Sequence, residues 1–316
     1  MDHPVVGSLL PVIALIAAGY FAGRRGWVGS AGARELSSLV FLLLTPALLF
    51  RTMSQVKPQS LDFMPVGAYF VAVTLVFFAT AAACGFNRRG AVLALTATFS
   101  NTVMIGIPLV SLAYGQAGLV TLFTLYTLHT VLLLTCATLL LELAVLRESR
   151  GRGDAGSLTR SVTTAFRNAL FHPVPLPILL GMAFAQTGWS LPAVVDTPLQ
   201  LLGSAFGPMA LLLVGLTLAH TPLARQLRGE LALVAAKNLL MPALVAAAGL
   251  ALGVSGLPLV VVVVVASLPA GANTFIFSQR YQVAEDTVTA TVGLSTLIAL
   301  VTVPTVMLLV SLLPAA

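Results

Sequence analysis

Long apolar runs dominate the chain, and each run ends at a glycine, a proline or a charged residue. The runs are about twenty residues long, which is the length that an α-helix needs to cross a lipid bilayer. They occupy ten stretches, at residues 4–23, 36–54, 62–86, 91–114, 119–142, 172–189, 198–219, 231–254, 258–279 and 287–313. The pattern therefore predicts an all-α polytopic membrane protein with ten transmembrane spans.

Composition supports this prediction. Of the 316 residues, 58% are hydrophobic and only 8% are charged, and the mean hydropathy is +1.02. A chain this apolar cannot form a soluble surface. The residues that lead into the first run are acidic rather than basic, and no small-residue cleavage site precedes Arg24, so we expect this run to be the first span and not a signal peptide.

Basic residues alternate between the loops. Thirteen of the sixteen lie after odd-numbered spans: Arg24, Arg25, Arg34, Arg88, Arg89, Arg147, Arg150, Arg152, Arg160, Arg167, Arg225, Arg228 and Arg280. Lys and Arg favour cytoplasmic loops, so we expect both termini outside a cell inner (plasma) membrane. This bias also accounts for the net charge of +6 without a nucleic-acid partner.

The longest hydrophilic segment divides the chain into two sets of five spans. It predicts a first repeat at 1–147, a cytoplasmic connecting loop at 148–170 and a second repeat at 171–316. Five is odd, so the second set enters the membrane from the opposite side, and any internal repeat is an inverted one.

Matched prolines hint at such a repeat. Pro46 and Pro108 are 62 residues apart, whereas Pro208 and Pro269 are 61 apart, and the first of each pair falls in the second span of its half. Matched breakers in corresponding helices indicate a binding site between inverted repeats. Prolines are also common in membrane helices without any repeat.

Span four carries a polar and helix-breaking sequence, "SNTVMIGIP" at 100–108. Pro108 cannot donate a backbone hydrogen bond to the carbonyl of Met104, and Gly106 weakens the same turn. We therefore expect the helix to open between Asn101 and Pro108.

Span nine carries a similar sequence, "SLPAGANTF" at 267–275. Pro269 is expected to free the carbonyl of Val265, Gly271 loosens the turn, and Asn273 with Thr274 can cap a new helix start.

Two such openings facing each other would line a polar cavity, with helix N-termini favouring an anion. The substrate would then contact Asn101, Thr102, Asn273 and Thr274. The alternative is that each kink tunes packing and that neighbouring helices satisfy the two amides.

Three other side chains are candidates. His129, near the middle of span five, can bind a carboxylate or carry a proton, but a structural histidine is an equal alternative. Lys237 lies only seven residues from its predicted helix start, which favours an ammonium that reaches the cytoplasmic interface over a substrate counter-charge. Arg51, at the outer end of span two, follows Pro46 by five residues.

Enzymatic chemistry has no basis in these residues. Glu35, Glu142 and Glu230 lie at span ends, so no carboxylate pair is predicted at mid-membrane, and no zinc-ligand spacing or phosphate-binding loop occurs. Cys84 and Cys136 fall inside spans, where a thiol acts as a small apolar group. We expect neither an enzyme nor a cofactor-binding protein.

The broken segments resemble those of one family. "SNTVMIGIPLVSLAYG" (100–115) is similar to the Asn-Thr, Gly-Ile-Pro-Leu and Tyr-Gly signature of the auxin efflux carrier family, which includes plant carriers and bacterial malonate and malate permeases. "SLPAGANTFIFSQRYQVAEDT" (267–287) resembles its ninth helix and "VFLLLTPALLFRTM" (40–53) its second. The resemblance covers essentially the whole chain.

The resemblance implies two inverted five-helix repeats in which helices four and nine are interrupted and cross. Spans one, two, six and seven would form a scaffold that dimerises, and spans three to five and eight to ten a moving transport domain. Asn101 would contact the substrate carboxylate, and Pro108 and Pro269 would be the crossover prolines. His129 falls where plant carriers have a glutamine, and His172 departs from a common Asn-Pro.

These observations predict a secondary transporter of small organic anions, such as malonate or malate, that works by an elevator type of alternating access. Protons could couple through His129, Na⁺ could bind freed carbonyls with Ser100 and Thr102, and uniport is the third option. The alternative from another class is a channel or a ligand-binding sensor for organic anions.

Overall fold

The computed structural model describes residues 4–56, 61–149, 163, 167, 174–221 and 228–312. Most of the predicted connecting loop 148–170 lies outside the described residues, and so does His172.

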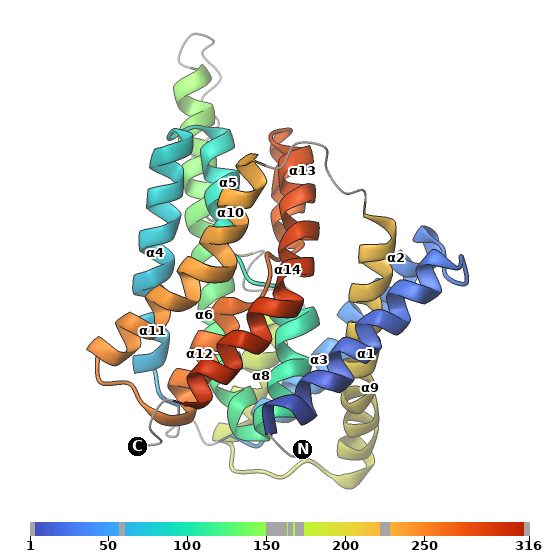
Figure 1. The fold of residues 1–316 in the computed structure, drawn as a ribbon. Coiled ribbons are helices and arrows are strands. Elements are labelled where there is room, and N and C mark those ends of the chain that lie inside the picture. Colours follow the sequence, from blue (N-terminus) through green and yellow to red (C-terminus); the bar gives the residue numbers. More distant parts are fainter. Residues whose placement is uncertain are drawn as a thin grey trace.

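The described chain is helical throughout, apart from short connections and one isolated β-bridge (Figure 1). Its elements are α1 (Pro4–Arg24), α2 (Ser30–Leu39), η1 (Val40–Leu44), α3 (Thr45–Ser54), α4 (Met64–Cys84), α5 (Arg88–Thr98), η3 (Thr102–Gly106), α6 (Ile107–Ser149), α8 (Pro175–Gln186), α9 (Ala193–His220), α10 (Arg228–Ala235), η4 (Ala236–Leu240), α11 (Met241–Ala251), α12 (Gly256–Ser267), α13 (Asn273–Tyr281) and α14 (Glu285–Ser311). The start of α1 and the end of α14 both lie at the bottom of Figure 1.

Several of these helices are long and apolar enough to cross a membrane. Among the described residues there are six, namely Ser30–Ser54, Met64–Cys84, Thr102–Leu141, Ala193–His220, Gly229–Ala251 and Glu285–Ser311. Shorter apolar helices occur at Leu9–Arg24, Pro175–Gln186 and Gly256–Ser267. The prediction of an all-helical, polytopic membrane protein is therefore confirmed.

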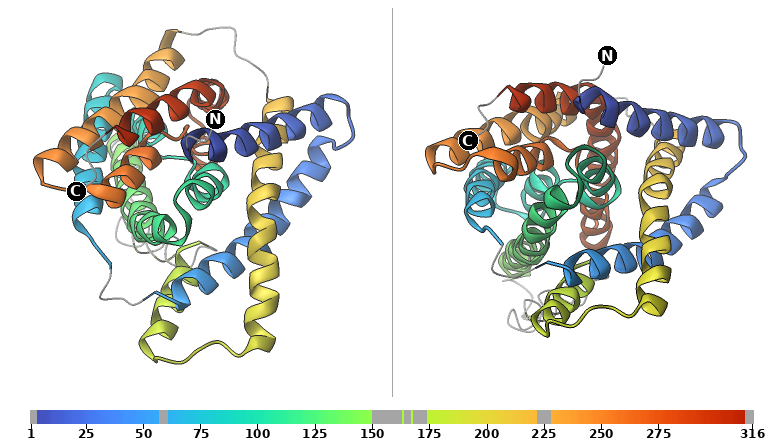
Figure 2. Two further views of the ribbon diagram at one scale, coloured as in Figure 1. Left: turned by 60° about the horizontal axis from the view of Figure 1, so that its bottom comes forward. Right: turned by 90° about the horizontal axis from the view of Figure 1, so that it is seen from below.

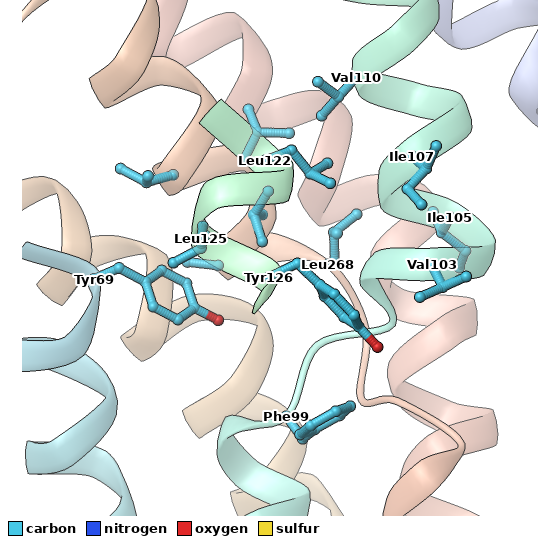
Figure 3. Close-up of a cluster of buried hydrophobic side chains, with 14 of the residues drawn as sticks. Tyr69, Phe99, Val103, Ile105, Ile107, Val110, Leu122, Leu125, Tyr126 and Leu268 are labelled. Carbon is cyan, nitrogen blue, oxygen red and sulfur yellow. The ribbon is translucent and has the colours of Figure 1, made fainter. Parts of the chain in front are cut away.

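Helix α6 reverses direction at a glycine. Gly115 has φ 60° and ψ −152°, a backbone conformation that only glycine adopts readily. The bend falls between the predicted spans 91–114 and 119–142. The residues before Gly115 continue the helix of η3, and the longer part after it runs back alongside them (Figure 3).

Three prolines are each preceded by a π-helical turn. The segments η1, η3 and η4 end two residues before Pro46, Pro108 and Pro242, respectively. A proline ring in an α-helix clashes with the carbonyl four residues earlier, and the wider π turn relieves that clash. Pro46 therefore does not interrupt its helix, because Ser30–Ser54 is continuous through η1.

Helices α1, α3, α8 and α9 pack together along one side of the molecule (Figure 2). The α1–α9 contact is close because it is built on glycines: a Cβ on Gly19 would overlap the Leu212 carbonyl, and one on Gly215 would overlap the Ile16 carbonyl. Small residues permit this approach of two helix backbones in a membrane.

The remaining helices form a second bundle. α4 packs on α5 and α11, and α12 packs on α6, α11 and α14. Contacts of α6 and η3 with α1 and α9 join this bundle to the first, so the start of α6 lies at the boundary between the two groups.

Candidate functional site

Two short non-helical segments meet in the interior of the molecule. Residues 99–101 separate α5 from η3, and residues 268–272 separate α12 from α13. An antiparallel β-bridge pairs Ser100 with Ala270. The Asn101 amide donates to the Pro269 carbonyl at 2.8 Å, and the Gly271 amide donates to the Phe99 carbonyl at 2.8 Å. The two segments therefore satisfy backbone groups of each other.

Glycines allow this close approach. A Cβ added to Gly271 would lie 2.8 Å from Phe99 Cδ1 and 3.0 Å from the Ser100 carbonyl oxygen. One added to Gly106 would lie 2.7 Å from Leu268 Cδ1. Gly271 therefore lies against the first segment, and Gly106 lies against Leu268 of the second.

A buried polar network holds the second segment. The Ala270 amide donates to Ser295 Oγ at 3.0 Å, and Ser295 Oγ donates to Asn238 Oδ1 at 2.6 Å. Asn238 Nδ2 also donates to the Ser295 carbonyl at 3.1 Å. Asn238 comes from η4 and Ser295 from α14, so two distant elements fix the position of Ala270.

Lys237 lies beside this network. Its side chain is 0% exposed, and Nζ donates to the Ala266 carbonyl at 2.6 Å, near the C-terminal end of α12. The prediction that Lys237 reaches the cytoplasmic interface is therefore wrong. The carbonyls of the last helical turn have no intrahelical partner and carry partial negative charge, which favours a cation at that place.

The breaks differ in detail from the predictions. The non-helical residues 99–101 precede the interval expected to open, since the chain is helical from Thr102 onward. The Val265 carbonyl is not freed, because it accepts from the Leu268 amide at 3.3 Å. No side chain of Asn273 or Thr274 caps α13, and the Thr274 hydroxyl donates to the Gly271 carbonyl at 2.8 Å instead.

A cavity of about 160 Å³, here called cavity one, lies against the bridge. Residues of both segments line it, together with residues of or directly beside α2, η1, η3, α6, α9, α13 and α14: Phe99, Ser100, Asn101, Thr102, Val103, Met104, Gly271, Ala272, Asn273, Ser37, Phe41, Tyr126, Leu213, Val214, Thr217, Leu218, Thr221, Val292, Gly293 and Thr296. None of these lining side chains is charged. Cavity one thus offers amides, hydroxyls and an apolar wall.

Neutral hydrogen-bond donors gather at one end of cavity one. The side-chain amides of Asn101 and Asn273 have no hydrogen-bond partner among the described residues. Val103 and Met104 are in the first helical turn after the bridge, where backbone N–H groups lack an intrahelical acceptor. An anion placed there would meet donors from side chains and from a helix N-terminus.

His129 lies behind cavity one and does not line it. It is 2% exposed, and its ring centroid is 4.9 Å from that of Phe99, 5.4 Å from Tyr69 and 6.4 Å from Tyr126. Its Nε2 has no hydrogen-bond partner among the described residues. Figure 3 shows Phe99 and Tyr126 near the non-helical connection, with Tyr69 on the neighbouring helix.

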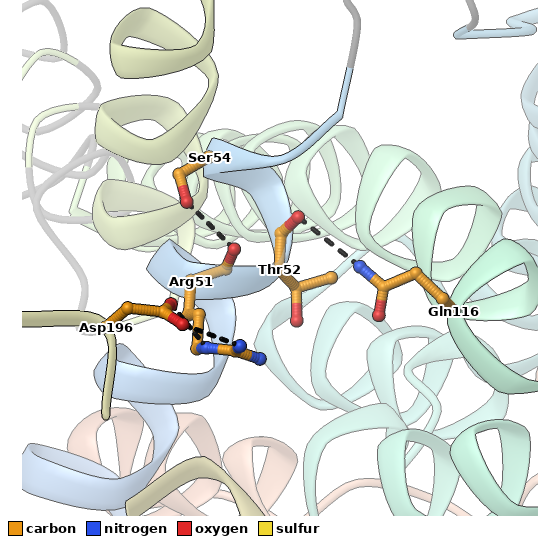
Figure 4. Close-up of polar contacts among 5 residues, drawn as sticks. All are labelled: Arg51, Thr52, Ser54, Gln116 and Asp196. Carbon is orange, nitrogen blue, oxygen red and sulfur yellow. Dashed lines mark hydrogen bonds and ion pairs between the residues drawn. The ribbon is translucent and has the colours of Figure 1, made fainter. Parts of the chain in front are cut away.

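Arg51 and Pro108 line a different cavity of about 360 Å³, here called cavity two. Arg51 forms a two-pronged ion pair with Asp196, with Nε to Oδ1 at 2.7 Å and the terminal Nη2 to Oδ2 at 3.0 Å (Figure 4). Of the predicted site residues, Ser100, Asn101, Thr102, Gly271 and Asn273 line cavity one, and Arg51 and Pro108 line cavity two. The others, Gly106, His129, Pro269 and Thr274, line neither cavity.

Sequence reasoning missed several polar residues around the bridge. Ser37, Thr217, Thr221 and Thr296 line cavity one, and Asn238 and Ser295 support the second segment. The hydroxyls resemble the many helical Ser and Thr residues that bond their own backbone. The sequence does carry a signal for Asn238, because this polar residue directly follows Lys237 in an otherwise apolar helix.

Comparisons with known proteins agree with this architecture. Residues 4–307 match the family described as membrane transport protein. A protein of Rhizobium meliloti (strain 1021) named "Putative malonate transporter" is 29% identical over 311 residues, covering 95% of this chain and 93% of that protein. The uncharacterized transporter YfdV of Escherichia coli (strain K12) is 27% identical, covering 95% of each chain.

A plant protein matches a shorter stretch. Auxin efflux carrier component 3a of Oryza sativa subsp. japonica is 31% identical over 153 residues, which is 46% of this chain and 25% of that protein. The resemblance predicted from the broken segments is confirmed, and the chain belongs to the membrane transport protein family that includes the auxin efflux carriers, as a multi-pass membrane transporter and not an enzyme.

Proposed function

We propose that this chain is a secondary transporter of small organic anions, with mono- or dicarboxylates such as malonate or malate as substrates. The observation that carries the proposal is the pairing of the two non-helical segments at the wall of cavity one. Asn101 and Asn273 bring unpaired amides to that wall from opposite halves of the chain. The substrate carboxylate accepts hydrogen bonds from them and from the N-terminus of η3.

Alternating access is supported by the two cavities on the η3–α6 helix. Thr102, Val103 and Met104 face cavity one, and Ile107, Pro108 and Ser111 of the same helix face cavity two. We assign α1, α2–α3, α8 and α9 to a scaffold and the second bundle to a transport domain that slides against it as an elevator. Movement of the bridge would then expose the substrate to each side in turn.

An inverted repeat is supported by the matching order of elements. α5, residues 99–101 and η3 in the first half correspond to α12, residues 268–272 and α13 in the second. The bridge is antiparallel, as expected for segments that enter the membrane from opposite sides. We assign 1–147 and 171–316 to the two repeats.

Orientation follows from the basic loops. Cavity one lies near Ser37 and Thr221, close to the helix ends where the alternating basic residues predict the cytoplasm. The structure is then inward-facing, with both termini outside the inner membrane. The scaffold also exposes large apolar residues such as Leu42, Leu180 and Leu201, which lipid or a second copy would cover.

The test is uptake of labelled carboxylates by purified protein in proteoliposomes. Malonate is the first substrate to use, because one relative carries that name. Asn101→Ala is expected to fold normally and to lower malonate uptake at least about tenfold, since hydrogen bonds to charged groups contribute about 1.5 to 3 kcal/mol. Gln279→Ala removes an exposed amide from α13 and serves as the control. Wild-type uptake by Asn101→Ala would contradict the assignment.

Coupling is tested in the same vesicles by imposing pH and Na⁺ gradients separately. A proton site at His129 predicts that His129→Gln transports without pH dependence. The ring faces Tyr69 and Tyr126. A requirement for Na⁺ would direct attention to Ser100 and Thr102, whereas uptake driven by membrane potential alone would indicate uniport.

A channel or a sensor is the second candidate function. The polar side chains gather in two separate cavities and do not form a continuous polar stripe along the described helices, which favours a carrier. Single-channel currents or flux that never saturates would indicate a channel. Malonate binding without counterflow would indicate a sensor.

A further inference from the structure

Cavity two lies on the opposite face of the η3–α6 helix, and its mostly apolar lining contains a few polar side chains. Arg51 of α3, Ser111 and Gln116 of α6, and Gln200 and Ser204 of α9 all line it. Arg51 is the one charged residue in its described lining. Cavity one has none, so among the described residues only cavity two of this pair has a cationic side chain in its lining.

The Arg51 guanidinium is held at the edge of cavity two by Asp196. Two of its five N–H groups bind the Asp196 carboxylate, at 2.7 Å and 3.0 Å. Asp196 lines a neighbouring cavity of about 370 Å³ with Gln55 and Trp189, and it does not line cavity two. The pair therefore stands between two cavities, with the cation facing cavity two.

The ion pair can open at low cost. The side chains of Arg51 and Asp196 are 27% and 28% exposed, and partly solvated pairs contribute little to stability. An incoming carboxylate has the same planar, two-pronged geometry as Asp196, so it can take the same place on the guanidinium. Asp196 therefore supplies a carboxylate of the chain itself at the position that a ligand carboxylate would occupy.

We propose that Arg51 is a carboxylate-binding subsite in cavity two, and that Asp196 occupies it until a substrate carboxylate replaces it. This inference rests on the proposed function and deepens it, because it names the group that receives the anion before the bridge is reached. Gln116 lies beside the subsite, and its Nε2 donates to the Thr52 carbonyl at 3.5 Å (Figure 4). That contact joins α6 to α3 directly after Arg51.

The first experiment measures uptake of labelled malonate from the cavity-two side in vesicles of known orientation. Arg51→Gln is expected to raise KM about tenfold or more while kcat changes less than about twofold. Asp196→Asn removes the competing carboxylate and is expected to lower KM several-fold. An unchanged KM in Arg51→Gln would overturn the proposal.

A charge swap separates a subsite from a structural ion pair. Arg51→Asp combined with Asp196→Arg keeps the pair but places the cation toward the neighbouring cavity. We expect the double variant to keep the thermal stability of the wild type in detergent and the high KM of Arg51→Gln. Recovery of the wild-type KM by the swap would show that the pair only holds α3 to α9.

Failure of the subsite and failure of the proposed function have different signatures. If the wild type transports malonate and Arg51→Gln does so with unchanged KM, the subsite is refuted and the transporter stands. If the wild type transports no carboxylate, but malonate raises its melting temperature and not that of Arg51→Gln, the subsite stands and the transport function is refuted.

Discussion

Segments 99–101 and 268–272 meet at one bridge, yet they are held in different ways. The second segment is fixed by buried side chains from other elements, through Ser295 and Asn238 on Ala270. Besides its backbone bonds, the first has two long side-chain contacts among the described residues: the Tyr69 hydroxyl lies 3.4 Å from Ser100 Oγ, and the hydroxyl of the neighbouring Thr102 donates to the Ser100 carbonyl at 3.4 Å. The second segment, residues 268–272, is therefore fixed by other elements and is here called the frame. The first segment, residues 99–101, is positioned mainly by its backbone hydrogen bonds to the frame.

The difference explains where a ligand can bind. The Ala270 amide of the frame is satisfied by the Ser295 hydroxyl, whereas the side-chain amide of Asn101 lines cavity one without a partner among the described residues. A buried polar group without a partner is costly, so such a group is kept where a ligand or water can satisfy it. Changes to the frame should cost stability, and changes to the first segment should cost binding.

The largest expected loss of stability comes from adding a side chain at Gly271, where the two segments are in close contact. Gly271→Ala would press a Cβ against the Ser100 carbonyl and the Phe99 ring, and neither can move without shifting the bridge. We expect a loss of about 3 kcal/mol in the free energy of unfolding, the upper end for overpacking. Denaturation in detergent micelles measures it.

Gly106→Ala is the matched control. Its Cβ would meet the end of the Leu268 side chain, which can rotate away, so we expect a loss of about 1 kcal/mol. Equal losses in the two variants would mean that the backbone contact at Gly271 is no less adaptable than the side-chain contact at Gly106.

A middle-sized effect is expected from the network that holds Ala270. Ser295→Ala leaves the Ala270 amide and Asn238 Oδ1 without this partner, at a cost of about 2 kcal/mol. Thr291→Val, on the same helix, removes a buried hydroxyl that bonds only its own backbone, at Thr287. The same denaturation assay should show little loss for Thr291→Val. A loss as large as that of Ser295→Ala would mean that Ser295 does not stabilise the bridge more than any other buried hydroxyl of this helix.

The smallest effect is expected at the support of the first segment. Tyr69→Phe removes a long hydrogen bond to Ser100 and keeps the ring packing, so we expect a loss of less than about 1 kcal/mol. A loss in unfolding free energy as large as that of Ser295→Ala would show that side chains of other elements hold the first segment as firmly as the second.

Much of the fold was predictable because its signals are local. A run of twenty apolar residues predicts a membrane helix wherever it stands, and glycine and proline mark irregular backbone within a few residues. Gly271, Asn101 and Asn273 were found in this way, and all three line cavity one. The prediction failed on side-chain capping at Asn273, because a residue type indicates a cap without fixing its rotamer.

The supporting contacts were not predictable because they join distant residues. Asn238 and Ser295 are 57 positions apart, Lys237 and Ala266 are 29 apart, and Arg51 and Asp196 are 145 apart. No periodicity or motif links such positions in a single sequence. Lys237 was misassigned for this reason, since an ammonium near a helix start favours the interface unless a buried acceptor is known.

The π turns before Pro46, Pro108 and Pro242 act as register shifts. Each places one extra residue in a turn, and one residue corresponds to about 100° of rotation in an α-helix. Residues before and after such a turn therefore point in directions that no single helical wheel reproduces. Deleting one residue from Ala236–Leu240 would convert this π turn into an ordinary α-helical turn. One half of the helix would then rotate relative to the other, and its side chains would turn away from their present partners.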